Sequence, residues 1–360
     1  MKAIVRRGGQ LIEAECEEIT PGPGQVLVAT HACGICGSDL HAVKGLERML
    51  EQNSPQNSSG TLDASRDLVL GHEFCAEILD HGPQCSRRFK AGTRVVSVPW
   101  IMGPDGQELV GFSSRFPGGF GERMVLDEAR LLAVPNGLSS EVAAMTEPLA
   151  VGTHAAAALS LADRPVALIL GCGPVGLAVI ASLKARGIGP VVACDFAPGR
   201  RAIAARMGAD VVIDPATVSP HAHWEKMDVP ATLASLTIAE LAGRDVRRAA
   251  IFDCTGAKGI LQSIIEEGPP HAQIIVVGTC AHPDTILPVL ALRKQLRFDF
   301  TYAYTATEFA ATLANIAEGR IDVSPMLSRT VGRAEVADIF DELSSHQSPL
   351  IKVSVAPGRS

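Results

Sequence analysis

Residues 166–176 have the sequence VALILGCGPVG, an apolar run that passes directly into a glycine-rich turn. A helix-like stretch, residues 177–185, follows this turn. A strand, a glycine turn and a helix in this order are what a dinucleotide-binding fingerprint requires. Gly171 permits the tight turn, Gly173 lets the backbone approach a pyrophosphate, and Gly176 lets the helix pack closely on its strand. The predicted phosphate-binding residues are Gly171, Gly173, Pro174, Val175 and Gly176.

A second apolar run, residues 191–195, ends in the carboxylate of Asp195. An acid at this distance from the first glycine commonly binds the hydroxyls of the adenosine ribose. Its charge would repel a 2′-phosphate, which favours NAD over NADP, although Arg200 and Arg201 follow closely. We therefore assign Asp195 and Arg200 to the cofactor site and expect NAD as the cofactor.

The pattern of strands predicts two kinds of architecture along the chain. Before residue 150, short β-like runs separated by Gly and Pro turns are typical of an antiparallel, barrel-like domain. Beyond it, helix-like and strand-like segments alternate to about residue 294, which predicts an α/β, doubly wound parallel (Rossmann) sheet. The predicted strands are 25–30, 74–79, 94–98, 123–126, 249–254, 273–277 and 351–355, and residues 307–318 and 335–343 are predicted helices.

A candidate metal site lies in the first part of the chain, where residues 34–41 are GICGSDLH and residues 71–73 are GHE. The thiolate of Cys36 and the imidazole of His72, with a carboxylate, suit zinc in an open, catalytic coordination shell. Cys33 and Cys36 alone would equally fit a redox dithiol or two buried small residues. The GHE motif and the glycine fingerprint favour a metal-ligand role for Cys36, and Cys33 is predicted to be structural.

A Lewis-acidic metal beside a nicotinamide indicates a redox reaction at a carbinol carbon, in which hydride leaves for the nicotinamide ring. The ordered set of motifs resembles the zinc-dependent medium-chain alcohol and polyol dehydrogenases nearly end to end. The segments that carry this resemblance are MKAIVRRGG (1–9), PGPGQVLV (21–28), GICGSDLH, GHE, PGGFGERMVL (117–126), TEPLAVGTHA (146–155), the glycine fingerprint, IFDCTG (251–256) and EGRIDVSPMLSRTV (318–331).

The resemblance implies that Cys36 and His72 are zinc ligands, with Glu73 and Glu147 as the carboxylates that complete the shell or exchange within it. Glu147 would also suit an ordinary helix start, where the helix dipole favours an acid. The fourth ligand therefore stays open between Glu73, Glu147 and water.

The same resemblance gives three further residues catalytic roles. Ser38 would accept the proton of the alcohol and pass it toward the ribose and His41, whose ordinary pKa of about 6.5 suits the solvent end of a relay. Asp39 would orient the ligand His72 and raise its basicity.

Family resemblance also predicts how the chain divides into domains. A discontinuous GroES-like catalytic domain would comprise residues 1–150 and 295–360, and an NAD-binding Rossmann domain would comprise residues 151–294. A homodimer or homotetramer is the expected assembly.

Two stretches depart from the family pattern. Many relatives carry four closely spaced cysteines for a second, structural zinc, but residues 86–171 contain no cysteine here. Residues 99–117 are predicted to form a short, turn-rich loop instead, so we expect one zinc per subunit. Residues 44–66 contain the polar segment EQNSPQNSSGTLDAS, which predicts a mobile surface insertion or a lid. Leu46, Met49 and Leu50 at its start would then close over an apolar or bulky substrate.

Composition excludes several classes of protein. A net charge of −7 argues against a nucleic-acid-binding protein. The nine cysteines are irregularly spaced, as expected for reduced thiols. Neither a signal peptide nor a membrane-spanning run is recognisable, which predicts a cytoplasmic protein without a membrane partner.

Together these features predict an NAD-dependent zinc enzyme that oxidises a secondary alcohol or polyol to a ketone, with small-molecule partners only. A primary alcohol dehydrogenase with the same machinery and a zinc-free quinone or enoyl reductase are the alternatives within the superfamily. A non-catalytic scaffold that kept only the fold is disfavoured, because every position needed for metal and proton relay is filled.

Overall fold

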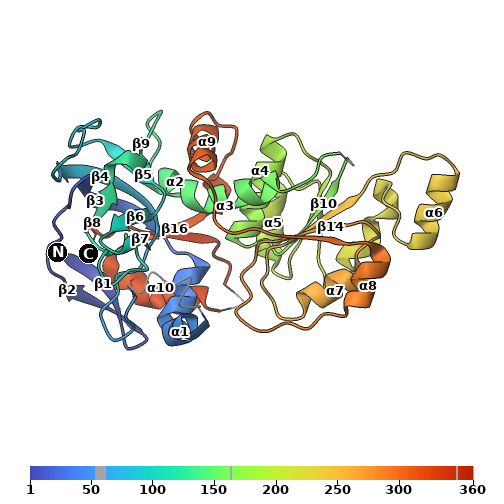
Figure 1. Ribbon diagram of the computed structural model, residues 1–360, viewed down its shortest axis with the longest axis horizontal. Helices are drawn as coiled ribbons and strands as arrows, with labels where there is room; N and C mark the ends of the chain where they lie inside the picture. Colours follow the sequence, from blue (N-terminus) through green and yellow to red (C-terminus); the bar gives the residue numbers. More distant parts are fainter. Residues whose placement is uncertain (53–61, 163, 346–347, 360) are drawn as a thin grey trace. The chain divides into compact units, whose positions relative to one another are not determined.

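The chain forms two compact units (Figure 1). The computed structural model describes residues 1–360 except 53–61, 163, 346–347 and 360. Unit 1 comprises Met1–Pro148, Phe309–Gly319 and Leu327–Ser360. Unit 2 comprises Leu149–Glu308 and Arg320–Met326. Each unit is assembled from segments that are distant in the sequence.

Unit 2 is built on a six-stranded parallel sheet with the strand order β12-β11-β10-β13-β14-β15. Its strands are β10 (Val166–Leu170), β11 (Val191–Cys194), β12 (Val211–Ile213), β13 (Ala249–Asp253), β14 (Gln273–Val276) and β15 (Arg297–Phe300). The chain first proceeds outward from β10 and then returns to β13 on its other side. This reversal is the topological switch point at which doubly wound sheets bind ligands.

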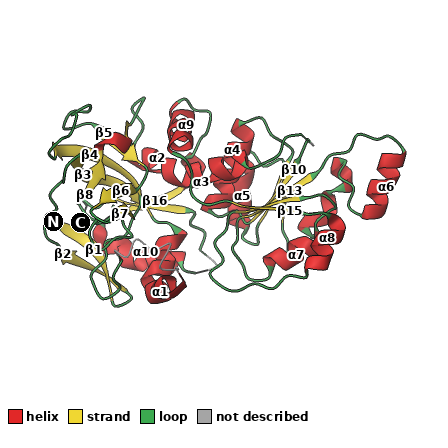
Figure 2. Ribbon diagram, viewed as in Figure 1, coloured by secondary structure: helices red, strands yellow, loops and turns green. Residues whose placement is uncertain are grey.

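Helices cover both sides of this sheet (Figure 2). The helices and 3-10 turns of this part of the chain are α3 (Thr146–Ala157), α4 (Pro174–Ala185), α5 (Pro198–Arg206), η2 (Pro220–His223), η3 (Glu225–Met227), α6 (Leu233–Leu241), α7 (Ile260–Glu267), α8 (Pro288–Lys294) and η4 (Ser324–Met326). β10 and β13 are buried at every residue, as expected for central strands covered on both faces. The predicted doubly wound sheet is therefore present.

The domain boundary predicted at residue 294 differs from the division observed in the structure. β15 follows that boundary, but it pairs in parallel with β14 over Gln273–Val276. Unit 2 therefore continues to Glu308 before the chain returns to unit 1. The extra strand is short and carries Arg297 and Asp299, so its apolar pattern is weak.

Unit 1 contains a mostly antiparallel seven-stranded sheet with the order β16-β17-β3-β4-β5-β9, and β8 pairs with β3 as well. β1 and β2 form one hairpin and β6 and β7 another. The strands are β1 (Lys2–Arg7), β2 (Gln10–Glu15), β3 (Gln25–Gly34), β4 (Glu73–His81), β5 (Arg94–Ser97), β6 (Trp100–Gly103), β7 (Gly106–Leu109), β8 (Arg123–Asp127), β9 (Leu131–Ala133), β16 (Leu327–Val331) and β17 (Lys352–Val355). The helices and 3-10 turns are α1 (Gly37–Gln52), η1 (Glu128–Arg130), α2 (Ser140–Ala144), α9 (Ala306–Ala317), η5 (Arg333–Glu335) and α10 (Val336–Leu343).

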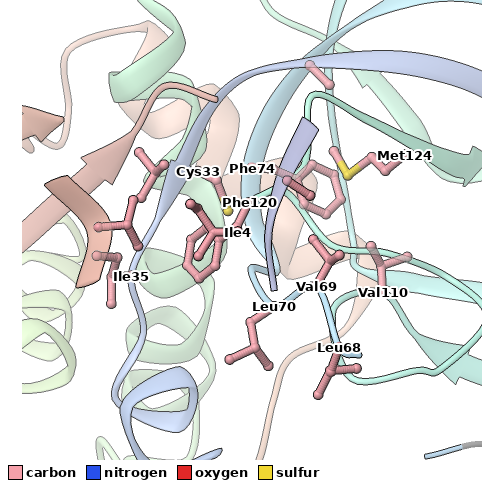
Figure 3. Close-up of a cluster of buried hydrophobic side chains, with 14 of the residues drawn as sticks. Ile4, Cys33, Ile35, Leu68, Val69, Leu70, Phe74, Val110, Phe120 and Met124 are labelled. Carbon is pink, nitrogen blue, oxygen red and sulfur yellow. The ribbon is translucent and has the colours of Figure 1, made fainter. Parts of the chain in front are cut away.

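The core of unit 1 brings together side chains from many of these strands (Figure 3). Four of these side chains are at most 3% exposed: Ile4 of β1, Cys33 of β3, Phe74 of β4 and Met124 of β8. They belong to the same cluster as the fully buried Phe120. Burial raises the pKa of the Cys33 thiol well above its usual range. Cys33 is thus a packed, unreactive thiol, as its sequence context suggests.

Within residues 99–117, predicted to form a turn-rich loop, residues 100–109 form a hairpin and only residues 110–117 are turns and bends. β6 and β7 pair in register from Trp100 with Leu109 to Gly103 with Gly106. Pro104 and Asp105 are the two residues of the turn, and Gly106 takes the positive φ of 129° that follows it. The prediction failed because Pro104 and Gly106 indicate a break without showing that the flanking residues pair.

Part of the insertion at residues 44–66 lies among the described residues. Residues up to 52 belong to α1, whose apolar positions Leu46, Met49 and Leu50 follow a helical spacing. Leu46 is fully buried, and the other two pack against the same core. Leu46 is therefore a core residue of unit 1 and not part of a lid, whereas a lid role for the half-buried Met49 and Leu50 stays a prediction. Most of the polar segment, residues 53–61, lies outside the described residues.

Within the described ranges, none of the helices has both the length and the apolar character needed to cross a membrane.

Candidate metal and cofactor sites

The end of β3 and the start of α1 position Cys36. Its carbonyl accepts hydrogen bonds from the amides of Asp39 (3.1 Å) and Leu40 (3.3 Å), so it is the residue from which the helix begins. The Asp39 carboxylate in turn accepts a 2.9 Å hydrogen bond from the Cys36 amide. The bond from the Cys36 amide to the Asp39 side chain is one half of a capping box, and together with the two bonds to the carbonyl it fixes the Cys36 backbone.

His72 and Glu73 lie at the start of β4, directly beside this turn. Gly34 pairs with Glu73 in the antiparallel β3–β4 ladder, which sets the register. Gly71 has a φ of 100°, and a Cβ there would lie 2.8 Å from the Cys33 sulfur. Only glycine fits this position, which explains why the GHE motif begins with one.

Cys36, His72 and Glu73 form a cluster that suits a metal ion. One ligand atom from each residue lies within 4.8 Å of the others. Ligand atoms around a tetrahedral zinc lie about 3.5 Å apart at the usual bond lengths, so a small adjustment would close the shell. A thiolate, an imidazole and a carboxylate are the donor set of catalytic zinc sites, and these residues therefore fit zinc.

Asp39 supports the imidazole from the opposite side. Its Oδ1 lies 3.4 Å from His72 Nδ1, and Asp39 itself is fully buried. Burial opposes protonation of His72, but the charges of Asp39 and Cys36 outweigh it and raise the imidazole pKa well above its usual range. The surroundings of His72 thus favour a bound cation, and zinc would compete with the proton for this place.

A buried lysine that the sequence analysis did not identify completes the cluster. Lys352 of β17 is 1% exposed, and its Nζ donates to both carboxylate oxygens of Glu73 at 2.7 Å and to the Ile35 carbonyl at 2.9 Å. Burial lowers the pKa of Lys352, but Glu73, Cys36 and Glu147 outweigh this effect and raise it. The sequence signal was Lys352 itself, a single lysine in the mostly apolar stretch 351–355, which indicates a buried cation that needs an acidic partner.

Glu147 occupies the first turn of α3 and is 9% exposed. Its charge acts on Lys352, which places it in the neighbourhood of the cluster. Among the described residues, however, it does not belong to the group whose ligand atoms converge. Glu73 rather than Glu147 is thus the carboxylate that the structure brings to Cys36 and His72.

Ser38 and His41, the residues expected to take part in a proton relay through the ribose, lie one helical turn apart in α1. Ser38 Oγ lies 3.5 Å from His72 Nε2, on the metal side of the imidazole. His41 lies one turn further along α1 and is exposed. No hydrogen bond joins Ser38 to His41 in the parts of the chain that the structure describes.

The glycine turn of unit 2 has the geometry that its sequence indicates. Gly171 has a φ of 89°, and a Cβ at Gly176 would lie 1.9 Å from the Gly171 carbonyl oxygen. A Cβ at Gly173 would meet no described atom within 4 Å, so the N-terminus of α4 is open there. Pro174 at the first helical position and Val175 after it complete this turn, which fits a pyrophosphate.

Asp195 lies at the carboxyl end of β11, beside this turn. Its carboxylate accepts hydrogen bonds from the amides of Cys172 and Ala197, both at 2.8 Å. Arg200 Nη1 lies 4.0 Å from Asp195, whereas Arg201 is bound to Asp214 at 2.9 Å. Arg200 is thus the cation that faces the Asp195 carboxylate, whereas Arg201 also donates to the Asp195 and Phe196 carbonyls.

These two sites and the fold define the class of protein. Residues 22–136 match the alcohol dehydrogenase GroES-like domain, and residues 174–318 match the zinc-binding dehydrogenase domain. The chain belongs to the zinc-type medium-chain alcohol and polyol dehydrogenases. It is accordingly an oxidoreductase that uses zinc and a nicotinamide cofactor.

The proteins to which this chain is similar include two bacterial (R,R)-butanediol dehydrogenases. The protein from Bacillus subtilis is 32% identical over 285 residues, which cover 75% of this chain and 76% of the relative. The protein from Neisseria gonorrhoeae is 28% identical over 364 residues and 97% of both chains. A crystal structure of 2R,3R-butanediol dehydrogenase from Bacillus subtilis matches with a TM-score of 0.77 and 27% identity over 99% of both chains.

Proposed function

We propose that this protein oxidises a vicinal diol or a related secondary alcohol to a ketone with NAD⁺, using one zinc ion bound by Cys36 and His72. The observation that carries the proposal is the converging cluster of the half-buried Cys36 with the buried His72 and Glu73. Similarity to butanediol dehydrogenases supports a secondary alcohol with a neighbouring oxygen as the substrate class.

The residues around the metal would divide the chemistry between them. Zinc, when bound, supplies a Lewis acid that lowers the pKa of the alcohol hydroxyl. Ser38 Oγ, on the metal side of His72, would accept the hydroxyl proton while passing its own toward the ribose of the bound cofactor, and the exposed His41 would take the proton up at the solvent end. Asp39 holds His72 in the tautomer that leaves Nε2 free for the metal.

Glu73 and Lys352 determine how the zinc shell is completed. Because Lys352 donates to both oxygens of Glu73, this carboxylate is neutralised without a metal. We propose that Glu73 exchanges between Lys352 and the zinc, so that substrate or water occupies the open position whenever Glu73 stays with Lys352. Only one zinc is expected, since the hairpin of β6 and β7 has no cysteine.

NAD is the proposed cofactor because a carboxylate at the end of the second strand, as Asp195 is, commonly binds the ribose hydroxyls and would repel a 2′-phosphate. Asp195→Ala should raise the KM for NAD⁺ and lower that for NADP⁺, since Arg200 then stays without its acid partner. An unchanged cofactor preference would contradict this assignment.

We propose a homo-oligomer that forms through the edge strand β15. This strand lies at one end of the sheet order, and the neighbouring Phe300 and Tyr302 are 73% and 81% exposed. Antiparallel pairing with a second copy about a two-fold axis at Phe298 would set Arg297 opposite Asp299 of the other copy. Arg297→Asp should weaken the oligomer in light scattering, and adding Asp299→Arg should restore it.

The proposed reaction is tested by following NADH formation with a panel of alcohols before and after chelation. The panel contains 2,3-butanediol, sorbitol, a primary alcohol of similar size and threonine. We expect oxidation of the diol or polyol, loss of activity on chelation and recovery with zinc. Preferred oxidation of the primary alcohol would favour the aldehyde-forming alternative, and zinc-independent turnover of a quinone would refute the proposal.

A further inference from the structure

The hairpin that replaces the expected cysteine lobe contains a buried carboxylate that the proposed chemistry does not use. Glu108 of β7 is 1% exposed, and its Oε2 accepts a 2.5 Å hydrogen bond from Ser113 Oγ. The guanidinium of Arg115 lies 3.5 Å from the other oxygen. Burying a carboxylate is costly unless its partners compensate, so this arrangement requires a reason beyond simple packing.

Ser113 transmits the position of Glu108 to the turn that follows the hairpin. Its side chain is 2% exposed, and its Oγ accepts hydrogen bonds from the amides of Arg115 (3.0 Å) and Phe116 (3.1 Å). The Phe116 carbonyl then accepts a 3.2 Å hydrogen bond from the Gly111 amide. The Ser113 hydroxyl thus uses its donor on Glu108 and its acceptor sites on the turn.

The same turn presents an aromatic ring to the metal site. Phe112 is half-buried, and its ring centroid lies 5.5 Å from that of the His72 imidazole at an interplanar angle of 62°. Gly111 packs directly on the backbone before His72, since a Cβ at Gly111 would lie 2.8 Å from the Gly71 carbonyl oxygen. The ring therefore has a fixed place beside the ligand histidine.

We propose that Glu108 is a positioning residue that acts through Ser113 to hold Phe112 as the apolar wall of the metal site. Phe112 then selects among secondary alcohols by the size of the apolar group next to the carbinol carbon. This inference rests on the proposed function, because it assigns the selectivity of that same site. Small aliphatic alcohols fit beside the ring, whereas bulky aryl alcohols collide with it.

The test compares kcat/KM for 2,3-butanediol and 1-phenylethanol in purified variants of the full chain. Phe112→Ala should shift the ratio toward the aryl alcohol by about tenfold, the scale on which apolar pockets discriminate. Glu108→Ala and Ser113→Ala should shift it in the same direction through the KM of the alcohol, with an unchanged KM for NAD⁺. Glu108→Gln keeps an acceptor oxygen for Ser113 and should retain the wild-type ratio.

A double variant decides whether Glu108 acts through the ring. Glu108→Ala combined with Phe112→Ala should show the selectivity of Phe112→Ala alone, because residues that act as one unit are not additive. Multiplied effects, or wild-type selectivity in folded Glu108→Ala and Ser113→Ala, would overturn the proposal. Asp105→Asn is the matched control, since it breaks the exposed Arg115–Asp105 ion pair in the same hairpin and should leave the ratio unchanged.

Failure of this inference is distinguishable from failure of the proposed function. If the wild-type protein oxidises neither alcohol with NAD⁺, the proposed function fails. If it oxidises 2,3-butanediol and the variants keep its selectivity, only the positioning role fails. Should Glu108→Ala not fold, Ser113→Ala and Glu108→Gln give the same comparison.

Discussion

Replacing Lys352 by methionine tests the electrostatics of the metal cluster. The variant would leave the Glu73 carboxylate, which is 1% exposed, without its partner and would remove the donor to the Ile35 carbonyl. Removing one member of a buried ion pair costs about 3–5 kcal/mol. At a urea dependence of about 1–3 kcal/mol per molar, the unfolding midpoint of unit 1 should fall by more than 1 M.

The assay is urea unfolding of the chelated protein, repeated with zinc. Because zinc also compensates the charge of Glu73, the loss should be smaller in the zinc-loaded protein. Lys352→Met combined with Glu73→Gln removes both charges and should regain much of the stability. Lys44→Met is the control, because its pair with Asp341 is exposed and contributes less than about 1 kcal/mol. Equal losses for Lys352→Met and Lys44→Met would refute the reasoning.

Three further predictions follow from the two sites and the fold. Asp39→Asn should weaken zinc binding by about 10- to 100-fold in a chelator competition, because the carboxylate that orients His72 is lost. Wild-type zinc affinity in this variant would contradict the orienting role of Asp39. Gly176→Ala should destabilise the protein by about 1–3 kcal/mol, since a Cβ there would lie 1.9 Å from the Gly171 oxygen. Gly173→Ala should keep the wild-type thermal stability and weaken NAD⁺ binding. The opposite pattern would exclude a phosphate site at this turn. Burial lowers the pKa of His221, whose neutral ring accepts a hydrogen bond from Trp224 at Nδ1. The neutral imidazole should therefore stabilise the fold fully above pH 6.5, the ordinary pKa of histidine, and this contribution should decline at lower pH. Stability against pH should be flatter in His221→Asn, and identical profiles would argue against this role.

The sequence was sufficient to predict most of the architecture, because the strands of unit 2 are short apolar runs bounded by glycines. The glycine turn at Gly171 and the strand that ends near Asp195 are confirmed at their predicted positions. β15 was not predicted, because an edge strand with exposed Arg297 lacks the continuous apolar pattern of its neighbours.

The candidate metal site was only partly visible in the sequence. The GICGSDLH and GHE motifs and the family resemblance they carry indicated Cys36, His72 and Glu73, which the β3–β4 register brings together. Lys352 was missed because it belongs to the last strand, and pairing across the whole length of the chain cannot be inferred from local spacing. Phe112 was hidden for a similar reason, since its contact with His72 depends on the hairpin of β6 and β7.

Metal content and alcohol oxidation, measured together for the wild-type protein and His72→Ala, test the central claim most directly. The account predicts one zinc per wild-type chain and NADH formation with the diol. His72→Ala should contain almost no zinc, fail to oxidise the alcohol and still bind NAD⁺, because the cofactor turn lies in unit 2. Equal zinc content and turnover in the two proteins would contradict the claim that the Cys36 and His72 cluster is the catalytic centre.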